Sequence, residues 1–312
     1  MTSVWRRLQL RIAGTTPARR FQEEADVGVA AVLSCFRSLK LDPQNANKKH
    51  EEMFDQAVEI VGAKKFEQQK QYVQDEVAKQ VQSCFEAVLK MPKDSEKNAP
   101  KMSLSGFERT TEVEEKLGIS DNFQKLFGFT LNVEKSSVPD AGEGVKLYGS
   151  ALIGSLVALY PGIVYLPEHY KKEHHISKLS NNPYARARFD SVIIDAKNES
   201  SSPRNPLAVA HKINHPPSGT SPNVIGFAFE FPPEGPFATK EFDELIPNSF
   251  VQEPSRLSMF GKRAIVHGLA FIAVADIADE EELFLNYRYN PDRLLPKWYT
   301  SIDADSDRAM WK

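Results

Sequence analysis

The sequence has few of the residues that would identify a disulfide scaffold, a cysteine-based metal site or a membrane protein. It holds only two cysteines, Cys35 and Cys84, in 312 residues, which excludes a disulfide framework and a cysteine-ligated zinc site and fits a reducing compartment. Its longest apolar run, residues 152–166, is interrupted by two glycines, a serine and a proline. Such a run is too short and broken for a membrane span; it predicts two buried strands and a turn.

Positive and negative charges nearly balance over the whole chain, but the N-terminus is basic. The net charge is −3 and the pI about 6.2, so no basic field predicts binding to nucleic acid. The first 22 residues, however, carry five arginines and no acid, with Trp5, Leu8 and Ile12 able to share a helix face. This pattern is typical of a mitochondrial transit peptide and equally of a solvated basic helix end, so the chain is expected in the mitochondrion or in the nucleus or cytoplasm.

Hydrophobic periodicity divides the remaining chain into a helical part and a part rich in strands. Residues 23–130 are predicted to be mainly helical, with a break near residues 45–47 and a flexible linker after Pro92. The clearest helical stripe consists of Val73, Val77, Val81, Cys84, Phe85 and Val88. Residues 131–288 instead alternate short β-branched runs with turns, and residues 289–312 form a polar tail with aromatics. The predicted class is α+β, mostly β after the helices.

The strongest single motifs for other chemistries are missing or incomplete. Gly142-Glu143-Gly144 lacks the third glycine of a dinucleotide fingerprint, because position 147 is Leu. A tight turn that brings backbone groups close to a ligand remains a reasonable interpretation. His211 and His215 have helical metal-ligand spacing, but Pro216 and Pro217 make that helix improbable. No metal site is predicted.

Two charged stretches are expected at the surface. His169, His174 and His175 lie in or beside the charged segment KKEHHISK, which is interpreted as solvated. The acidic cluster at residues 279–282 is interpreted as a solvated turn between two strands, and Tyr287, after it, as the end of a strand.

The order of the weak motifs is more informative than any one of them. They are, in chain order, Gly142-Glu143-Gly144, Tyr160-Pro161-Gly162, Ile194-Asp195-Ala196, Asn214-His215 with Pro222-Asn223, and Glu281-Glu282-Leu283 with Tyr287. This order and these spacings resemble the SET domain, the protein-lysine methyltransferase fold that uses S-adenosyl-L-methionine. The resemblance covers residues 136–288, about half of the chain. Within the family, the segments LFGFTL, AGEGV, LYPGIVY and NPLAV are most similar to the divergent group called SET domain-containing protein 9.

The resemblance implies a fold, a reaction and a set of site residues. It implies small curved sheets around a pseudoknot, in which the Asn-His loop and the Glu-Leu-x-x-x-Tyr segment cross. Gly142, Glu143, Gly144, Asn214, His215 and Tyr287 would bind the cofactor. Tyr160 and Tyr287 would line the channel for a lysine of a protein substrate, with the Tyr287 hydroxyl near the transferred methyl. The tail aromatics Tyr289, Trp298, Tyr299 and Trp311 would close that channel.

Departures from the family pattern keep two other interpretations open. Pro216-Pro217 replaces Ser-Cys after Asn-His, Asn286 replaces the usual Asp before Tyr287, and Glu280 replaces a Gly. The chain is therefore either a methyltransferase or a SET-fold binding protein without catalysis. A third interpretation is a helical scaffold in which the β part only supports the helices. No sequence feature predicts the substrate protein, the number of methyl groups transferred or the oligomeric state.

Overall fold

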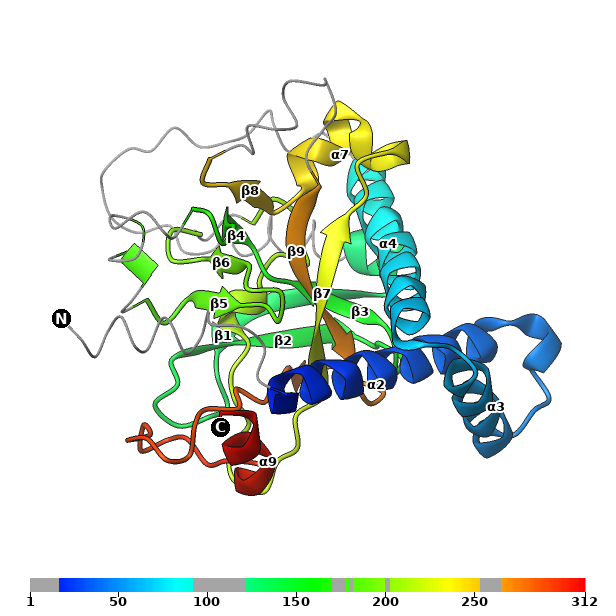
Figure 1. Ribbon diagram of the computed structural model, residues 1–312. Helices are drawn as coiled ribbons and strands as arrows, with labels where there is room; N and C mark the ends of the chain where they lie inside the picture. Colours follow the sequence, from blue (N-terminus) through cyan, green and yellow to red (C-terminus); the bar gives the residue numbers. More distant parts are fainter. Residues whose placement is uncertain are drawn as a thin grey trace.

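Helices come first in the chain and short strands follow (Figure 1). The computed structural model describes residues 17–91, 122–169, 175, 178–179, 182–199, 203–252 and 265–311. The predicted leader lies mostly outside these residues, as does the linker at 92–121, but helix α2 begins at Pro17 and so includes the leader's last residues. The α+β class predicted from the sequence is confirmed.

Three α-helices lie in residues 17–91, the first described part of the N-terminal region. They are α2 (Pro17–Leu41), α3 (His50–Gly62) and α4 (Phe66–Lys90), with a short 3₁₀ helix, η1 (Pro43–Asn45), between α2 and α3. The Asp42 carboxylate caps η1 by accepting from the Gln44 N–H at 2.9 Å, which places the break where it was predicted. The predicted stripe on α4 faces inward, and all its members are buried except the partly buried Val88.

Ten strands of the described chain form three small sheets. One contains β1 (Phe129–Lys135), β2 (Glu143–Gly149) and β10 (Glu281–Glu282), in that order. The second has the order β3 (Leu156–Leu159), β9 (Val266–Ala273), β7 (Val224–Phe231). The third has the order β5 (Ala185–Ala187), β6 (Ile193–Asp195), β4 (Gly162–Tyr165), β8 (Asn248–Phe250). Every pairing is antiparallel except β4 with β8.

Short helices connect these strands and end the chain. They are η3 (Ala210–Lys212), η4 (Gly235–Ala238), α7 (Lys240–Leu245) and α9 (Ala304–Met310). The apolar run 152–166 forms β3 and β4 with a turn between them, as predicted. Among the described residues, no helix combines the length and the hydropathy needed to cross a membrane.

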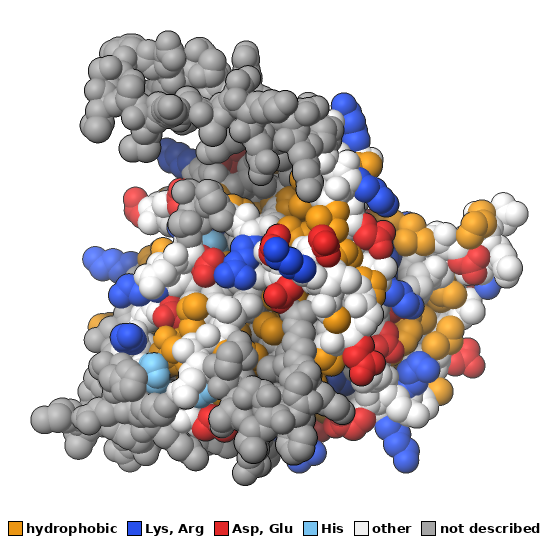
Figure 2. All heavy atoms as spheres, turned by 90° about the horizontal axis from the view of Figure 1, so that it is seen from above, with side chains coloured by type: hydrophobic (Ala, Val, Ile, Leu, Met, Phe, Trp, Pro, Cys, Tyr) orange, Lys and Arg blue, Asp and Glu red, His pale blue; other side chains and the backbone are white. Residues whose placement is uncertain are grey.

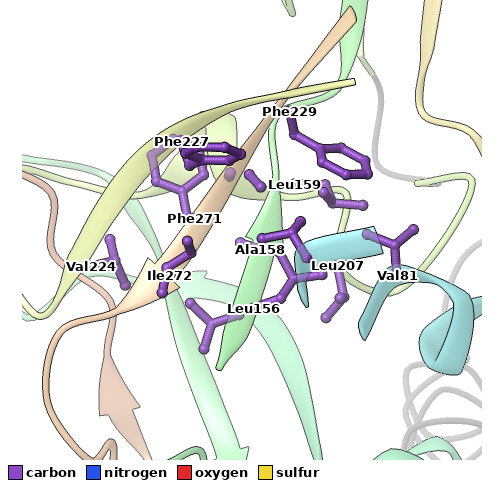
Figure 3. Packing of buried hydrophobic residues seen from close by; sticks show 14 of the residues in the cluster. Val81, Leu156, Ala158, Leu159, Leu207, Val224, Phe227, Phe229, Phe271 and Ile272 are labelled. Carbon is purple, nitrogen blue, oxygen red and sulfur yellow. The ribbon is translucent and has the colours of Figure 1, made fainter. Parts of the chain in front are cut away.

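Helices and sheets share one hydrophobic core. Val81 of α4 lies among Leu156, Leu159, Phe229 and Leu207 from the sheets and loops (Figure 3). The same helix satisfies backbone groups of the sheets: the buried Gln80 accepts from the Leu156 N–H at 2.8 Å. Buried polar groups require such partners. The helical region is therefore packed as part of the fold that carries the β sheets.

A partly buried ion pair joins the two ends of the described chain. Arg288, just after the last strand, makes a bidentate contact with Asp26 of α2, at 2.5 and 2.9 Å. Asp26 is 7% exposed, and paired planar geometry of this kind is the strong form of a charged hydrogen bond. Helix α2 thereby fixes the segment that follows Tyr287.

Two of the histidines expected at the surface are buried, so that prediction was wrong. His169 accepts from the Leu166 N–H through Nδ1 at 3.0 Å, and His175 packs edge-on against Tyr165, with ring centroids 5.4 Å apart. The charged neighbours in the sequence conceal this, because imidazole rings pack as partly apolar bodies. His174 lies outside the described residues.

Charges of both signs alternate over the visible surface. In the face shown in Figure 2, Lys and Arg side chains lie among Asp and Glu side chains and apolar patches. The described part of that face therefore presents no uniform basic surface.

Candidate functional site

The loop NHPPSGTSPN and the segment 283–287 cross each other. Asn214 forms a parallel bridge with Phe284, and Val224 forms one with Leu285. The Leu285 N–H donates to the Asn214 carbonyl at 2.9 Å, and the Phe284 carbonyl accepts from the Val224 N–H at 3.2 Å on the other side. Segment 283–285 therefore runs between the two ends of the loop. The apolar flanks of both segments are buried at this crossing.

Asn223 connects the loop to the crossing segment. Its Nδ2 donates to the Glu281 carboxylate and to the Glu282 carbonyl, both at 2.9 Å, and its Oδ1 accepts from the Phe284 N–H at 2.7 Å. The residue is 7% exposed. Its side chain is fully used inside the protein, so the role of Asn223 is to hold the crossing together.

The Gly-x-Gly turn lies against Asn214. Gly142 has a φ of +77°, which favours glycine, and the Glu143 carbonyl accepts from Asn214 Nδ2 at 2.9 Å. A Cβ at Gly144 would overlap with Glu282 Oε1 and lie 3.2 Å from Asn214 Nδ2. Two motifs separated by some 70 residues thus meet, and only a glycine at position 144 allows this approach.

Glu282 is buried beneath this turn, contrary to the predicted solvated cluster. It is 5% exposed and accepts from Ser136 Oγ at 2.6 Å, from the Ser137 N–H at 2.7 Å and from Ser137 Oγ at 2.5 Å. A buried carboxylate needs such donors. They lie on a segment about 145 residues earlier in the chain, which is why the local sequence does not predict the burial. Glu280 remains exposed.

A lysine closes the turn on its exposed side. The Lys212 ammonium lies 2.8 Å from Glu143 Oε2 and 5.6 Å from the centre of the Tyr184 ring. The hydrogen bond from Lys212 lowers the pKa of Glu143. This ammonium group is near the Gly-x-Gly turn, where it can meet a carboxylate of a ligand.

Both ring nitrogens of His215 bind backbone groups. Nε2 lies 2.7 Å from the Thr300 carbonyl and therefore carries the proton, while Nδ1 accepts from the Tyr287 N–H at 3.3 Å. The Tyr299 ring covers the imidazole, with centroids 4.3 Å apart. Burial lowers the pKa of His215. The side chain joins loop, crossing segment and tail, and the residue is 2% exposed, so the imidazole ring is not open to a ligand.

Tyr160 is buried and Tyr287 partly buried, and both phenol hydroxyls act as donors. The Tyr160 hydroxyl donates to the Tyr184 carbonyl and the Tyr287 hydroxyl to the Ile213 carbonyl, each at 2.8 Å. Burial raises the pKa of Tyr160 and raises the pKa of Tyr287 to about 12. Arg186 exerts the opposite effect on the pKa of both, so its charge lies near both rings. Both phenols are protonated at neutral pH.

The C-terminal tail packs its aromatic rings against Tyr287. Ring centroids lie 5.5 Å apart for Tyr287 and Tyr289, 6.2 Å for Tyr287 and Trp298, and 4.8 Å for the stacked Tyr289 and Tyr299. Trp311 instead donates through Nε1 to the Arg288 carbonyl at 2.9 Å. Three of the four predicted wall residues thus gather near Tyr287, and Trp298 stays 43% exposed.

The residues around the Gly-x-Gly turn fit a small zwitterionic cofactor. A Cβ at Gly142 would meet no heavy atom within 4 Å, so space is open beside the turn. No donor among the described residues reaches Asn214 Oδ1, which can accept from an ammonium group, while the Lys212 ammonium, already bonded to Glu143, has further N–H donors for a carboxylate. An amino acid group such as that of S-adenosylmethionine has this pair of charges.

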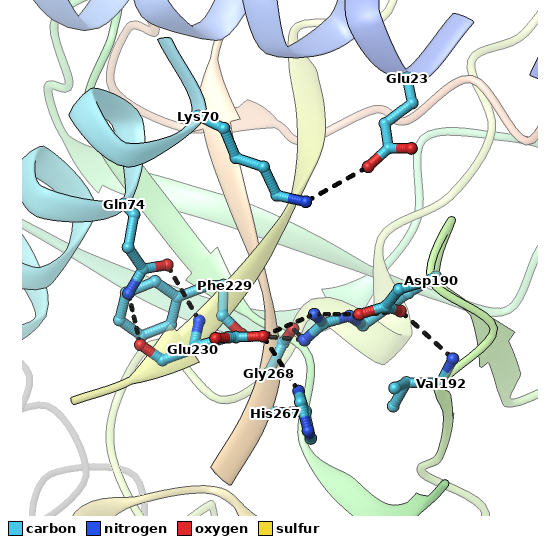
Figure 4. Close-up of polar contacts among 10 residues, drawn as sticks. Glu23, Lys70, Gln74, Asp190, Val192, Phe229, Glu230, His267 and Gly268 are labelled. Atoms are coloured by element: carbon cyan, nitrogen blue, oxygen red, sulfur yellow. Dashed lines mark hydrogen bonds and ion pairs between the residues drawn. The ribbon is translucent and has the colours of Figure 1, made fainter. Parts of the chain in front are cut away.

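One group of possible metal ligands occurs among the described residues, away from these motifs. Asp190, Glu230 and His267 bring their ligand atoms within 4.8 Å of one another (Figure 4). The Arg188 guanidinium lies there already, 2.7 Å from Asp190 and 3.6 Å from Glu230. A cationic side chain thus supplies the counter-charge that a metal would supply.

The sequence interpretation missed several site residues. Arg186, Tyr184 and Lys212 all border the motifs. The one local signal is the alternating stretch ARAR at 185–188, which places both arginines on the same face of a strand.

No model of a protein family matches this chain, and no curated protein matches it. Solved structures do show similarity, and SET-domain histone lysine methyltransferases are among them. A structure of KRYPTONITE in complex with mCHG DNA and SAH is 20% identical, with a TM-score of 0.30, covering 53% of this chain and 25% of that chain. CpSET8 from Cryptosporidium is 16% identical, with a TM-score of 0.27, covering 69% of this chain and 97% of that chain.

A solved structure that concerns the structural basis for the product specificity of histone lysine methyltransferases is 19% identical, with a TM-score of 0.28, and half of each chain is covered. This chain spans 25% of the KRYPTONITE chain and 16% of the matched chain in a structure of ctPRC2 in an autoinhibited conformation bound to S-adenosylmethionine. TM-scores of 0.27 to 0.30 do not support the assignment of a function. The function proposed below is therefore argued from the contacts within this chain.

Two histidines with a lowered pKa, His215 and His211 of η3, are expected to make the fold less stable in mild acid. Burial lowers the pKa of His215 and lowers the pKa of His211 to about 4, whereas unfolded histidine titrates near pH 6.5. Below about pH 6.5 the unfolded chain therefore binds more protons than the folded chain, and the free energy of unfolding falls. Urea unfolding at about pH 7.5 and 5.5 measures this. A His211→Gln variant should lose less stability between these pH values; an equal loss would contradict the assignment.

Proposed function

We propose that this chain transfers a methyl group from S-adenosyl-L-methionine to a lysine side chain of a protein substrate. The observation that carries the proposal is the meeting of residues 142–144, 214–223 and 282–287 at one crossing. Tyr287 lies at that crossing beside the aromatic tail. These are the segments whose order resembles a SET domain, and their contacts support that resemblance independently of motif spacing.

The cofactor would lie against the Gly-x-Gly turn. Gly142, Glu143 and Gly144 would contact it through backbone groups, Asn214 and Lys212 would hold its charged amino acid group, and His215 would contribute its backbone. When bound, S-adenosylmethionine supplies an electrophilic methyl group on a positively charged sulfur.

The protein residues would orient an uncharged lysine amine. Free lysine has a pKa of about 10.4, and burial near positive charge lowers that value. Tyr160 and Tyr287 are protonated and supply no counter-charge, and the positively charged sulfur of the cofactor would lie close by, so the site would disfavour an ammonium ion. No dedicated general base is then required, and alignment of the amine with the methyl group is the main task of the site.

A binding protein without catalysis is the second candidate. The observation that favours it is Arg186, whose guanidinium lies 5.2 Å from the centre of the Tyr287 ring. A cation there competes with a lysine for the same aromatic face. An assay of methyl transfer distinguishes the two candidate functions, because a methyltransferase and a binding protein would both bind a ligand at the crossing.

We also propose the finer assignments that the resemblance suggests. Membership of the SET domain-containing protein 9 group rests on the segments LFGFTL, AGEGV, LYPGIVY and NPLAV. Localisation to the mitochondrion rests on the arginine-rich leader. Imaging of the full chain with and without residues 1–22 tests the localisation.

Calorimetric titration with S-adenosylmethionine tests the proposed cofactor site. We expect one molecule to bind per chain, and Asn214→Ala to weaken binding by about tenfold, the effect of losing one or two hydrogen bonds to charged groups. Lys197→Ala, a change at an exposed lysine after β6, is the matched control and should leave affinity unchanged. No binding at millimolar cofactor would remove the proposed function.

A further inference from the structure

Arg186 lies on the inward face of an edge strand. In the third sheet β5 is the end strand, and Arg186 is paired with Ile194 of β6. Directly paired residues share a face of the sheet, and Ile194 is fully buried. An apolar residue is expected at such a position. A charged residue that breaks the pattern is expected mainly at functional sites.

Arg188, two residues further along the chain, is also an inward-facing arginine, and its hydrogen-bond partners are those of an arginine with a structural role. Arg188 is 4% exposed. It donates through Nη1 to the carbonyls of Phe229 and Gly268, at 2.9 and 2.7 Å, and through Nε and Nη2 to Asp190. Figure 4 shows Phe229, Glu230, Gly268 and Asp190 together at this position. Its charge and its donors are matched inside the protein.

Arg186 has no such set of partners. Among the described residues no carboxylate lies within ion-pair distance and no acceptor within hydrogen-bond distance. Its guanidinium lies over the face of Tyr287, 5.2 Å from guanidinium carbon to ring centre. The nearby Asp195 is paired with Ala185, so it lies on the opposite face, where it accepts from Asn182 and from the Lys197 N–H.

The guanidinium of Arg186, which has no anionic partner among the described residues, is available to an anion from outside the protein. A cation–π contact stabilises the charge but leaves the five N–H donors of the guanidinium free. Tyr160 and Tyr287 remain neutral, so neither supplies a counter-charge. Arg186 is only partly buried, so a ligand can reach it. The planar fork of the guanidinium matches a carboxylate best.

We propose that Arg186 selects protein substrates in which an acidic side chain lies within a few residues of the target lysine. The carboxylate pairs with the guanidinium beside Tyr287, and the lysine reaches the Tyr160–Tyr287 pair next to it. This inference rests on the proposed methyl transfer for the identity of the lysine. The pairing with an acidic peptide does not depend on the cofactor.

Titration of peptides measures this selectivity directly. The probes are synthetic lysine peptides in matched pairs, each pair with Glu or Gln at one position within three residues of the lysine. They are titrated by calorimetry into the full chain with and without S-adenosylmethionine. We expect at least one Glu peptide to bind about tenfold more tightly than its Gln partner, as for a charged hydrogen bond.

Two variants assign the preference to Arg186. Arg186→Met removes the charge and keeps a long side chain, and it should bind both members of the pair equally. Lys197→Ala removes an exposed cation and should keep the full preference. An equal Glu-to-Gln ratio in wild type and Arg186→Met overturns the inference, as does tighter binding of every lysine peptide by Arg186→Met, which would make Arg186 a blocking residue.

The same data separate this inference from the proposed function. Binding of S-adenosylmethionine without any preference for acidic peptides overturns the role of Arg186 and leaves the cofactor site intact. A preference for acidic peptides without cofactor binding supports the role of Arg186 and counts against methyl transfer.

Discussion

Tyr287→Phe is expected to lower methyl transfer about 100-fold or more while leaving S-adenosylmethionine affinity nearly unchanged. Loss of one well-placed hydrogen-bond donor at a reacting centre costs on the order of 10²–10³ in rate. The Tyr287 hydroxyl is held in place by its bond to the Ile213 carbonyl, and the ring keeps its packing in the Phe variant. Transfer of tritiated methyl groups to a protein extract measures the rate, and calorimetry measures the affinity.

Tyr289→Phe is the matched control for Tyr287→Phe. Tyr289 stacks on Tyr299 and contacts Tyr287 through its ring, and no described residue accepts from its hydroxyl. Its Phe variant should retain most of the activity. Equal rates for Tyr287→Phe and wild type would remove Tyr287 from the mechanism.

Gly144→Ala is expected to destabilise the fold by about 2–4 kcal/mol and to abolish cofactor binding. The added Cβ would overlap with Glu282 Oε1 and lie 2.9 Å from its Cδ. The Glu282 carboxylate would have to leave its contacts with Ser136 and Ser137, and overpacking combined with a disturbed buried charge has a cost of this size. Urea unfolding measures the free energy of unfolding.

Gly62→Ala is the matched control for the steric argument. Gly62 ends helix α3, and a Cβ there would meet no heavy atom within 4 Å. We expect its stability to stay within about 0.5 kcal/mol of the wild type, as for most surface substitutions. If Gly144→Ala were as stable as Gly62→Ala, the close approach of Glu282 to the Gly-x-Gly turn would be wrong.

The sequence predicted elements whose signal is local. The stripe on α4 and the runs that became β2, β3, β4, β6, β7 and β9 follow from the periods of helix and strand. Strands β5 and β8 were missed because their residues, Ala-Arg-Ala and Asn-Ser-Phe, do not form an apolar, β-branched run. Their hydrogen bonds to β6 and β4 make them strands.

Local signals fail for polar residues whose partners are distant in the chain. Glu282 resembles its solvated neighbours in sequence, yet its donors come from Ser136 and Ser137. Asn223 and His215 were placed at the right crossing by the order of motifs. Their contacts with Glu281 and Thr300, which determine what each side chain does, required the fold.

For Arg186 the sequence fails to show that partners are missing, whereas for Glu282 it fails to show that they are present. Its alternation with Arg188 indicates a shared face of β5, but the sequence does not distinguish the arginine that is fully paired from the one that is not. That difference depends on which face Asp195 takes and on where β7 and β9 end, because these strands supply the carbonyls that bind Arg188.

Acid hydrolysis of proteins labelled with tritiated S-adenosylmethionine tests the central claim most directly. The wild-type chain should place the label in methylated lysine, and Tyr287→Phe should place almost none there. A wild-type chain that binds S-adenosylmethionine yet yields no methylated lysine would contradict the claim and leave the crossing of the Asn-His loop and the Tyr287 segment as a binding site without catalysis.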